Sequence, residues 1–422
     1  MPFYAAPGVY VEEVPGGTRP IGAVGTSTAA FVGTAPDPGA RVGEAVAVNS
    51  WTNFVGTFAA EATSASPLAL AVHGFFENGG GRCYVVNAQE GAPIAGSGRG
   101  RNGLRALEAI DEVAIVAAPG HADADSWDAL LSHCERLEDR VAVLDTVAEV
   151  DDVEQLTRVA TAAPSSPRRR AAADADAGDT GAGDAEGAEA DTGTSAPTPS
   201  AGLRPRQSAY GACYFPHLVV RDPFSGERVT APPSGHVAGI WARTDLTRGV
   251  HKAPANEIVR GALDLTYPVT REEQAVLNPQ GVNCIRFFPG AGVLVWGART
   301  VDAEASEWRY LSVRRLFNML KESIAEGTRW IVFEPNDYIL WRSIVRDISA
   351  FLTRVWRDGA LFGRTPQEAF FVKCDAETNP PDVRDAGQVV AIIGIAPVKP
   401  AEFVVFKLSQ SAGGAEIETM GG

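Results

Sequence analysis

Apolar runs of strand length alternate with segments of helical spacing in the first part of the chain. The runs lie at 29–32, 82–87, 113–117 and 140–144, and the helical patterns lie at 67–78, 103–110 and 126–137. Asp123 and Asp125 precede the last of these helices, where acidic side chains suit the unpaired amides of a helix N-terminus. Strands that alternate with helices are typical of a parallel sheet covered by helices, so we expect an α/β layer here.

The segment 164–207 interrupts this pattern. Its only large apolar residue is Leu203, and seven acidic residues but no basic ones lie between Ala171 and Leu203. Such a composition buries too little apolar surface to offset the entropy lost on ordering. We therefore expect a disordered acidic surface insertion. A solvated loop is favoured over an acidic interaction tail.

The chain changes character again after two further buried segments, 218–220 and 237–241. Apolar residues at 284–288 and 293–296 flank the turn-forming residues 289–292, which predicts a hairpin or a tight corner.

Two long amphipathic helices follow the hairpin. The first is expected over 307–326 and the second from about 336 to 359, with a strand at 331–333 between them. Residues 370–372 should pair with 389–395 in a small sheet that these helices cover.

Both ends of the chain are rich in strand-forming residues. Residues 8–14 and 402–408 are mostly β-branched and aromatic, with Pro and Gly nearby. Ends as apolar as these rarely fray in water, so each is expected to find a partner.

Composition narrows the functional classes. The chain has 422 residues, of which 45% are hydrophobic and 21% charged, as in globular proteins of two or three domains. A net charge of −15 argues against general nucleic-acid binding, which draws on clustered Lys and Arg. No basic leader with an apolar stretch begins the chain, and no run approaches eighteen apolar residues. We therefore expect synthesis and assembly in the cytoplasm, without membrane insertion.

No constellation of residues predicts catalysis, a cofactor or a metal site. The five cysteines are scattered without a C-x-x-C pair, which suits a reducing compartment. Glycine-rich stretches at 22–27 and 79–81 lack the Lys of a phosphate loop and are interpreted as turns. Ser234 and His236 lie close together in the sequence, but neighbours in one turn seldom act as nucleophile and base.

One segment is basic although the chain as a whole is acidic. Nine Lys or Arg against five Asp or Glu lie between Arg309 and Arg357. In the second long helix, Arg342, Arg346 and Arg357 recur opposite the apolar stripe. This basic ridge is either a solvated helix face or a docking surface for an acidic partner.

Several segments, in order along the chain, resemble the tail sheath proteins of contractile phages and of extracellular contractile injection systems. They are Ala5-Ala6-Pro7-Gly8-Val9-Tyr10-Val11-Glu12-Glu13, Pro232-Pro233-Ser234-Gly235-His236-Val237-Ala238-Gly239, Lys252-Ala253-Pro254-Ala255-Asn256, Gly281-Val282-Asn283-Cys284-Ile285-Arg286, Val295-Trp296-Gly297-Ala298-Arg299-Thr300 and Trp308-Arg309-Tyr310-Leu311-Ser312-Val313-Arg314-Arg315-Leu316. Only the acidic insertion departs from the family pattern.

This resemblance implies an α/β (α+β) fold with two domains and two arms. An outer, subtilisin-like α/β domain without catalysis would comprise 23–163 and 208–275, and an inner C-terminal α+β domain would comprise 276–400. Strand arms would lie at 1–22 and 401–422, with the insertion 164–207 on the outer surface. The arms would add strands to neighbouring subunits through Val9, Tyr10, Val11, Val14, Phe403, Val404, Val405, Phe406 and Leu408.

The resemblance also implies function and partners. Subunits would stack as hexameric rings around an inner tube protein, contact baseplate and terminal cap proteins, and contract to drive the tube through a target envelope. Arg314, Arg315, Arg342, Arg346 and Arg357 are candidate tube-facing residues. The alternatives are an α/β hydrolase-like enzyme, suggested by fold analogy alone, and a non-contractile coat protein.

Overall fold

A nine-stranded sheet forms the frame of the larger domain in the computed structural model, which describes residues 20–96, 100–161, 202–304 and 307–403. In spatial order its strands are β2 (Ala45–Val48), β3 (Cys83–Asn87), β1 (Ala29–Gly33), β4 (Ile115–Ala117), β5 (Val141–Asp145), β6 (Gly211–Phe215), β11 (Val282–Phe288), β12 (Gly292–Val295) and β9 (Glu257–Ile258). The six strands from β3 to β11 are parallel to one another; β2 pairs antiparallel with β3 at one side, and at the other β12 pairs antiparallel with both β11 and β9.

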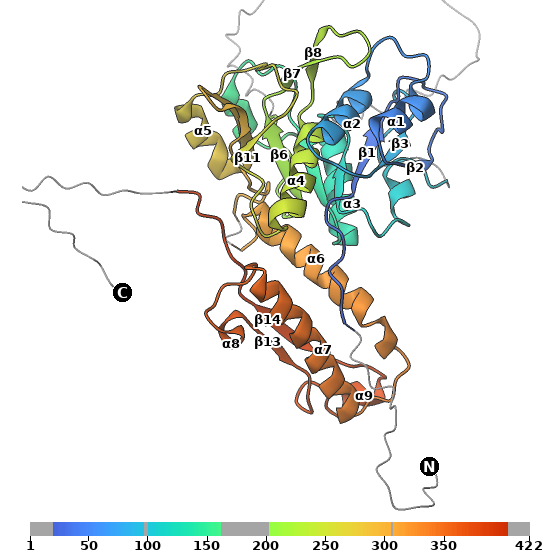
Figure 1. Cartoon of the computed structure of the whole chain (residues 1–422), viewed down its shortest axis with the longest axis vertical. Helices are drawn as coiled ribbons and strands as arrows, with labels where there is room; N and C mark the ends of the chain where they lie inside the picture. Colours follow the sequence, from blue (N-terminus) through green and yellow to red (C-terminus); the bar gives the residue numbers. More distant parts are fainter. Residues whose placement is uncertain (1–19, 97–99, 162–201, 305–306, 404–422) are drawn as a thin grey trace, which may run out of the picture.

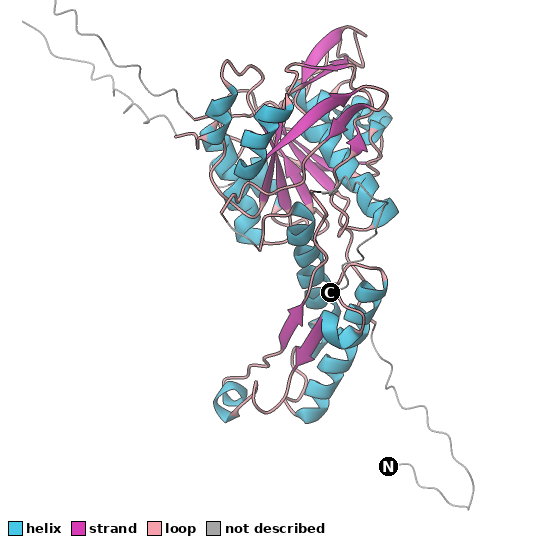
Figure 2. Cartoon of the chain, turned by 90° about the vertical axis from the view of Figure 1, so that its left-hand side faces the viewer, coloured by secondary structure: helices cyan, strands magenta, loops and turns pink. Residues whose placement is uncertain are grey.

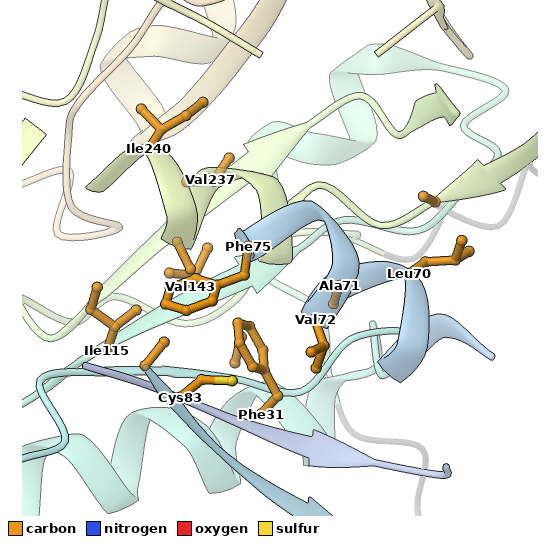
Figure 3. Close-up of a cluster of buried hydrophobic side chains, with 14 of the residues drawn as sticks. Phe31, Leu70, Ala71, Val72, Phe75, Cys83, Ile115, Val143, Val237 and Ile240 are labelled. Carbon is orange, nitrogen blue, oxygen red and sulfur yellow. The ribbon is translucent and has the colours of Figure 1, made fainter. Parts of the chain in front are cut away.

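Helices cover both faces of this sheet (Figures 1 and 2). One face packs against α1 (Trp51–Phe58), α2 (Pro67–Glu77) and α4 (Ser234–Arg248), and the other against α3 (Ala124–Leu137) and the 3-10 helix η1 (Gly103–Leu107). Because side chains alternate along a strand, Phe31 enters the first core and Val32 the second. Figure 3 shows Phe31 and Phe75 of the first core, whose rings meet edge to face at 5.5 Å.

Smaller elements complete the larger domain. A three-stranded sheet has the order β10 (Asp264–Leu265), β7 (Leu218–Arg221) and β8 (Arg228–Ala231). The remaining helical segments are η2 (Val153–Thr157), α5 (Arg271–Leu277) and η3 (Asn278–Gln280).

One long helix connects the larger domain to a smaller one (Figure 1). It is α6 (Leu311–Gly327), whose Leu311 lies in the core of the larger domain and whose Leu316 and Leu320 lie in the core of the smaller one. The smaller domain also contains η4 (Arg329–Ile331), α7 (Tyr338–Arg357), α8 (Pro366–Ala369), β13 (Phe370–Lys373), α9 (Pro381–Asp385) and β14 (Ile392–Ile395).

Several predictions from the sequence are confirmed. The fold is mixed α/β, the hairpin of β11 and β12 encloses residues 289–291, and α6 and α7 lie within one to four residues of their expected bounds. The α7 N-terminus is set by Asp337, whose carboxylate accepts from the amides of Ile339 and Leu340. The small sheet also forms, as β13 pairs antiparallel with β14.

The expected domain boundary at 275/276 is wrong. That boundary places β11 and β12 in the inner domain, but β11 pairs in parallel with β6, from Val282 opposite Cys213 to Cys284 opposite Phe215. Both strands therefore belong to the large sheet, and the division falls just before α6. A hairpin pattern specifies its own two strands but not the sheet they join.

Two smaller corrections concern local structure. The expected strand at 331–333 is instead the end of η4 followed by an exposed turn in which Phe333 has φ +71°. The end of the expected insertion, 202–207, is packed: Arg204 forms a bridge with Val159, and the Arg206 guanidinium binds Glu135 at 2.7 and 2.8 Å. Residues 162–201 lie outside the described part of the chain.

Candidate assembly surfaces

The ribbon of β13 and β14 exposes two strand edges. Within the described residues, β13 pairs only with β14 and β14 only with β13. One face of the ribbon packs on α7 through Phe370, Val372, Ile393 and Ile395, while Phe371 and Ile392 are exposed on the other. Two strands alone are marginally stable, and unpaired edges readily accept another strand.

The first described residues run along α6 from the smaller domain to the larger one (Figure 1). Ile21 is buried against Gly327, where an added Cβ would lie 2.7 Å from the Ile21 side chain. The Val24 amide donates to Ser323 Oγ at 3.0 Å, and Thr26 Oγ1 donates to Asp245 Oδ2 at 2.6 Å. The segment 20–22, expected within the N-terminal strand arm, is therefore fixed to the body of the subunit.

Most of the predicted arm residues lie outside the described part of the chain. These are Val9, Tyr10, Val11, Val14, Val404, Val405, Phe406 and Leu408. Phe403 is described and is 74% exposed.

The basic ridge of α7 lies on the solvent side of the helix. Arg342, Arg346 and Arg357 are exposed, opposite a buried stripe of Leu340, Ile344, Ile348, Leu352 and Val355. Arg346 Nε binds Asp347 Oδ1 at 2.9 Å. Three exposed guanidinium groups on one face suit contact with an acidic surface.

Arg314 and Arg315 do not belong to that surface, which corrects their assignment as tube-facing residues. Arg314 is buried, with its guanidinium carbon 4.1 Å from the Trp308 ring centre and 4.7 Å from that of Tyr210. Burial lowers the pKa of Arg314. Arg315 forms a buried ion pair with Asp245. Their positions on α6, between the two domains, explain why they turn inward.

The Ser234 and His236 pair does not form a nucleophile and base. Ser234 Oγ donates to Asp145 Oδ2 at 2.6 Å, and the Ser234 amide donates to Asp145 Oδ1 at 2.8 Å. His236 is buried against Gly74, and its Nδ1 has no hydrogen-bond partner among the described residues. Burial lowers the pKa of His236 to about 3, which leaves a neutral core histidine.

Other reactive groups are also enclosed. All five cysteines are buried free thiols, and burial raises the pKa of each, so each thiol stays protonated at neutral pH. Across the described ranges, no three His, Cys, Asp or Glu side chains are grouped in a way that could hold a metal ion. No helix in the same ranges is long and apolar enough to cross a membrane.

The chain matches two protein-family descriptions in sequence. Residues 102–301 match the phage tail sheath protein central domain, and residues 303–411 match the phage tail sheath C-terminal domain. The junction between the two matches agrees with the corrected boundary before α6. The chain therefore belongs to the contractile tail sheath protein family.

Curated relatives agree with this membership. The tail sheath protein of Vibrio phage KVP40 is 30% identical over 186 residues, which are 43% of this chain and 27% of the phage protein. The tail sheath protein of Enterobacteria phage T4 is 24% identical over 51% of this chain and 32% of the phage protein. The matches thus span about a quarter to a third of these relatives' length.

Solved structures match nearly the whole chain. The sheath complex of an extracellular contractile injection system, PVC, in its contracted state is 26% identical, with a TM-score of 0.72 over 98% of this chain and 99% of that one. The contracted helical sheath of the anti-feeding prophage is 27% identical, with a TM-score of 0.70 over 97% of this chain and 100% of that one. These neighbours are structural sheath proteins, not enzymes, and this chain is a structural protein of the same family.

Proposed function

We propose that the chain is the repeating subunit of a contractile sheath around the inner tube of a phage tail or a phage-tail-like injection system. The observation that carries this proposal is the ribbon of β13 and β14, which packs on α7 by one face and whose two outer edges pair with no other strand of the described residues. An edge of this kind favours addition of a strand from another chain. The matched structures are described as sheaths in a contracted state.

In this proposal, neighbouring subunits supply the missing strands. Residues Val9 to Val14 and Phe403 to Leu408 have the apolar, β-branched character that strand addition needs. Each added strand would contribute four or five backbone hydrogen bonds, at roughly 0.5 to 1.5 kcal/mol net apiece. Such links would join stacked hexameric rings and hold while the domains repack.

Contraction would draw on binding energy between subunits, without a nucleotide. The extended sheath would be the less stable packing, and a signal from the baseplate would release it to drive the tube forward. The inner tube, baseplate and terminal cap proteins are the partners in this proposal, with no nucleic acid and no membrane insertion. In this proposal the subunit is synthesised and assembled in the cytoplasm. It is a component of a phage-tail-like particle that can be released from the cell.

The test is negative-stain microscopy of the full chain expressed with its tube protein, beside a variant that lacks residues 1–14. We expect striated tubes of two lengths and widths from the full chain, and single rings or monomers from the truncated one. Tubes of one fixed length would instead identify a non-contractile coat. A monodisperse monomer from the full chain, even with the tube protein present, would overturn the proposal.

A matched control isolates the role of strand pairing. Val11→Pro removes one backbone N–H donor from the arm and should reduce tube formation, because an added strand loses a ladder hydrogen bond. Val11→Thr keeps the N–H donor and the β-branched shape. Equal assembly of the two variants would exclude strand addition by this arm.

A further inference from the structure

The end of the described chain returns from the smaller domain to the larger one. The last backbone hydrogen bond within the smaller domain joins the Val398 amide to the Ala360 carbonyl at 3.1 Å. Four residues later, Glu402 contacts three residues that precede α6 or lie at its start: Asn278, Arg299 and Tyr310. Glu402 thereby ties the root of the C-terminal arm to the larger domain.

The contacts of Glu402 satisfy both carboxylate oxygens. Arg299 donates from Nε to Oε1 at 2.9 Å and from Nη2 to Oε2 at 2.6 Å, the geometry of a forked pair. Asn278 Nδ2 also donates to Oε1 at 2.7 Å, and Tyr310 Oη lies 3.5 Å from Oε2. The third guanidinium nitrogen, Nη1, donates to the Asn278 carbonyl at 3.1 Å.

The larger domain holds Arg299 in place without help from Glu402. The Arg299 amide donates to Asn283 Oδ1 at 2.7 Å, and Asn283 Nδ2 donates to the Arg299 carbonyl at 2.8 Å. Asn283 is fully buried in β11, and Arg299 also forms a bridge with Tyr310. Gly297 permits this close packing, since an added Cβ would lie 2.8 Å from Asn283 Oδ1.

The charge of Glu402 is stabilised where it lies. Partial burial raises the pKa of Glu402, but hydrogen bonds and charge from Arg299, with Asn278, outweigh burial, so that its net pKa is lowered. The carboxylate therefore stays ionised through the neutral range and below it, where the forked pair needs it to be charged.

We propose that Glu402 and the preformed site of Asn278, Arg299 and Tyr310 form a clamp that fixes the root of the C-terminal arm to the larger domain. The arm then follows the larger domain when the two domains move, although residues 396–398 are bonded to the smaller domain. The clamp also pre-orders the root, which reduces the entropy lost when the arm binds another subunit. This second role rests on the proposed function, whereas the clamp itself does not.

The clamp can be tested on the free, full-length subunit by proteolysis. Chymotrypsin cleaves after Phe403, and its active site must bind the flanking residues in extended form, which requires Glu402 to leave Arg299. We expect Glu402→Gln and Arg299→Lys each to raise the cleavage rate after Phe403 by roughly tenfold, because each loses the charged forked pair. The double variant should cleave no faster than the faster single variant, since both changes remove one interaction.

The matched control is Glu377→Gln, which removes an exposed pair with Lys373 in the smaller domain and should leave this cleavage rate unchanged. Glu402→Gln is the decisive variant, since Glu402 is only partly buried and follows the last strand of the smaller domain, so the change carries little risk to folding, which its melting temperature checks. Equal cleavage of Glu402→Gln and the unaltered chain, or fully additive effects in the double variant, would overturn the clamp.

Polymerisation with the tube protein gives the second readout. Glu402→Gln should raise the concentration needed for half-maximal sheath formation by roughly tenfold, because the arm root is no longer pre-ordered. An unchanged concentration, with faster cleavage, would overturn the role in assembly and leave the clamp standing. If the unaltered chain forms no sheath, the proposed function fails, and the proteolysis result still decides the clamp.

Discussion

Arg315 on α6 and Asp245 on α4 form a buried, forked ion pair that joins the connecting helix to the larger domain. Their atoms meet at 2.6 and 3.0 Å, and their side chains are 2% and 3% exposed. The Arg315 guanidinium also lies over the Trp241 ring at 4.8 Å and donates to the Thr26 carbonyl at 3.0 Å. One side chain therefore connects α6, α4 and the first described segment.

Removal of Arg315 should strongly destabilise the subunit. Arg315→Met leaves the Asp245 charge buried without its partner, which costs about 3 to 5 kcal/mol of unfolding free energy. Denaturant unfolding of the purified subunit measures this. Arg315→Met with Asp245→Leu removes both charges and should be less destabilised than Arg315→Met alone. A loss below about 1 kcal/mol in the single variant, the size typical of a surface pair, would contradict the structural role.

The buried carboxyl of Asp145 should make stability depend on pH. Burial raises the pKa of Asp145 to about 7, with the Ser234 hydrogen bonds acting in the opposite direction. An acid whose pKa is raised in the folded state is protonated there while the unfolded chain is already ionised. Its contribution to stability is therefore full below the unfolded pKa near 3.8 and is lost as pH rises towards about 7.

Asp145→Asn should abolish that loss, since the amide cannot ionise and can still bond Ser234. Unfolding free energies at pH 4, 5.5, 7 and 8 for both chains test this, and their difference should grow in favour of the variant as pH rises to 7. If the unfolding free energies of the two chains changed in parallel with pH, Asp145 would not be the source of the pH dependence. Asp222→Asn is a control in which stability should change with pH in the opposite direction. Burial opposes ionisation of Asp222, but the amides of Ala65, Phe224 and Ser225 donate to its carboxylate and hold the pKa of Asp222 low. The native Asp222 therefore contributes less to stability as pH falls.

Gly235 permits the close approach of α2 and α4. A Cβ at this position would lie 2.2 Å from Ala71 Cα, and the backbone of α2 has no room to yield. Gly235→Ala should cost about 2 kcal/mol of unfolding free energy or more by overpacking. Gly56, in α1, has no atom within 4 Å of such a Cβ, so Gly56→Ala should stabilise by about 0.5 to 1 kcal/mol. Thermal unfolding compares the two variants. Equal changes in melting temperature for Gly235→Ala and Gly56→Ala would contradict the close approach of α2 and α4 as the cause.

The basic ridge of α7 predicts a loss of tube attachment when its charges are reversed. Arg342→Glu, Arg346→Glu and Arg357→Glu together should weaken co-sedimentation with the tube, and more so at low salt, because exposed charges act through a screened field. Arg342→Glu and Arg357→Glu should each alter the unfolding free energy by no more than about 0.5 kcal/mol, whereas Arg346→Glu also removes the partner of the buried Asp347 carboxylate and lowers stability further. Arg228→Glu, at an exposed position of strand β8, is the control. Unchanged tube binding by the triple variant would exclude this surface.

Short-range sequence patterns were sufficient to predict the individual helices, strands and turns named below. The helical spacing of α6 and α7, the hairpin turn and the alternation before residue 163 depend on periodicity and turn chemistry, which each segment carries by itself. The same holds for the pairing of β13 with β14, where two apolar runs had few alternatives. The segments that resemble sheath proteins indicated the family for a related reason, since each is a local sequence of fixed residues.

Long-range partners were decided only by the tertiary structure. Nothing in the spacing of Arg314 and Arg315 distinguishes them from Arg342 and Arg346, yet the first two are buried because α6 passes between two domains and α7 has one side in solvent. Likewise, Glu402 meets Arg299 across 103 residues, and β11 pairs with β6 although β7, β8, α4 and α5 lie between them in the sequence. A charge or a strand edge is satisfied by whichever group the fold brings near it, and that proximity is a property of the packed chain.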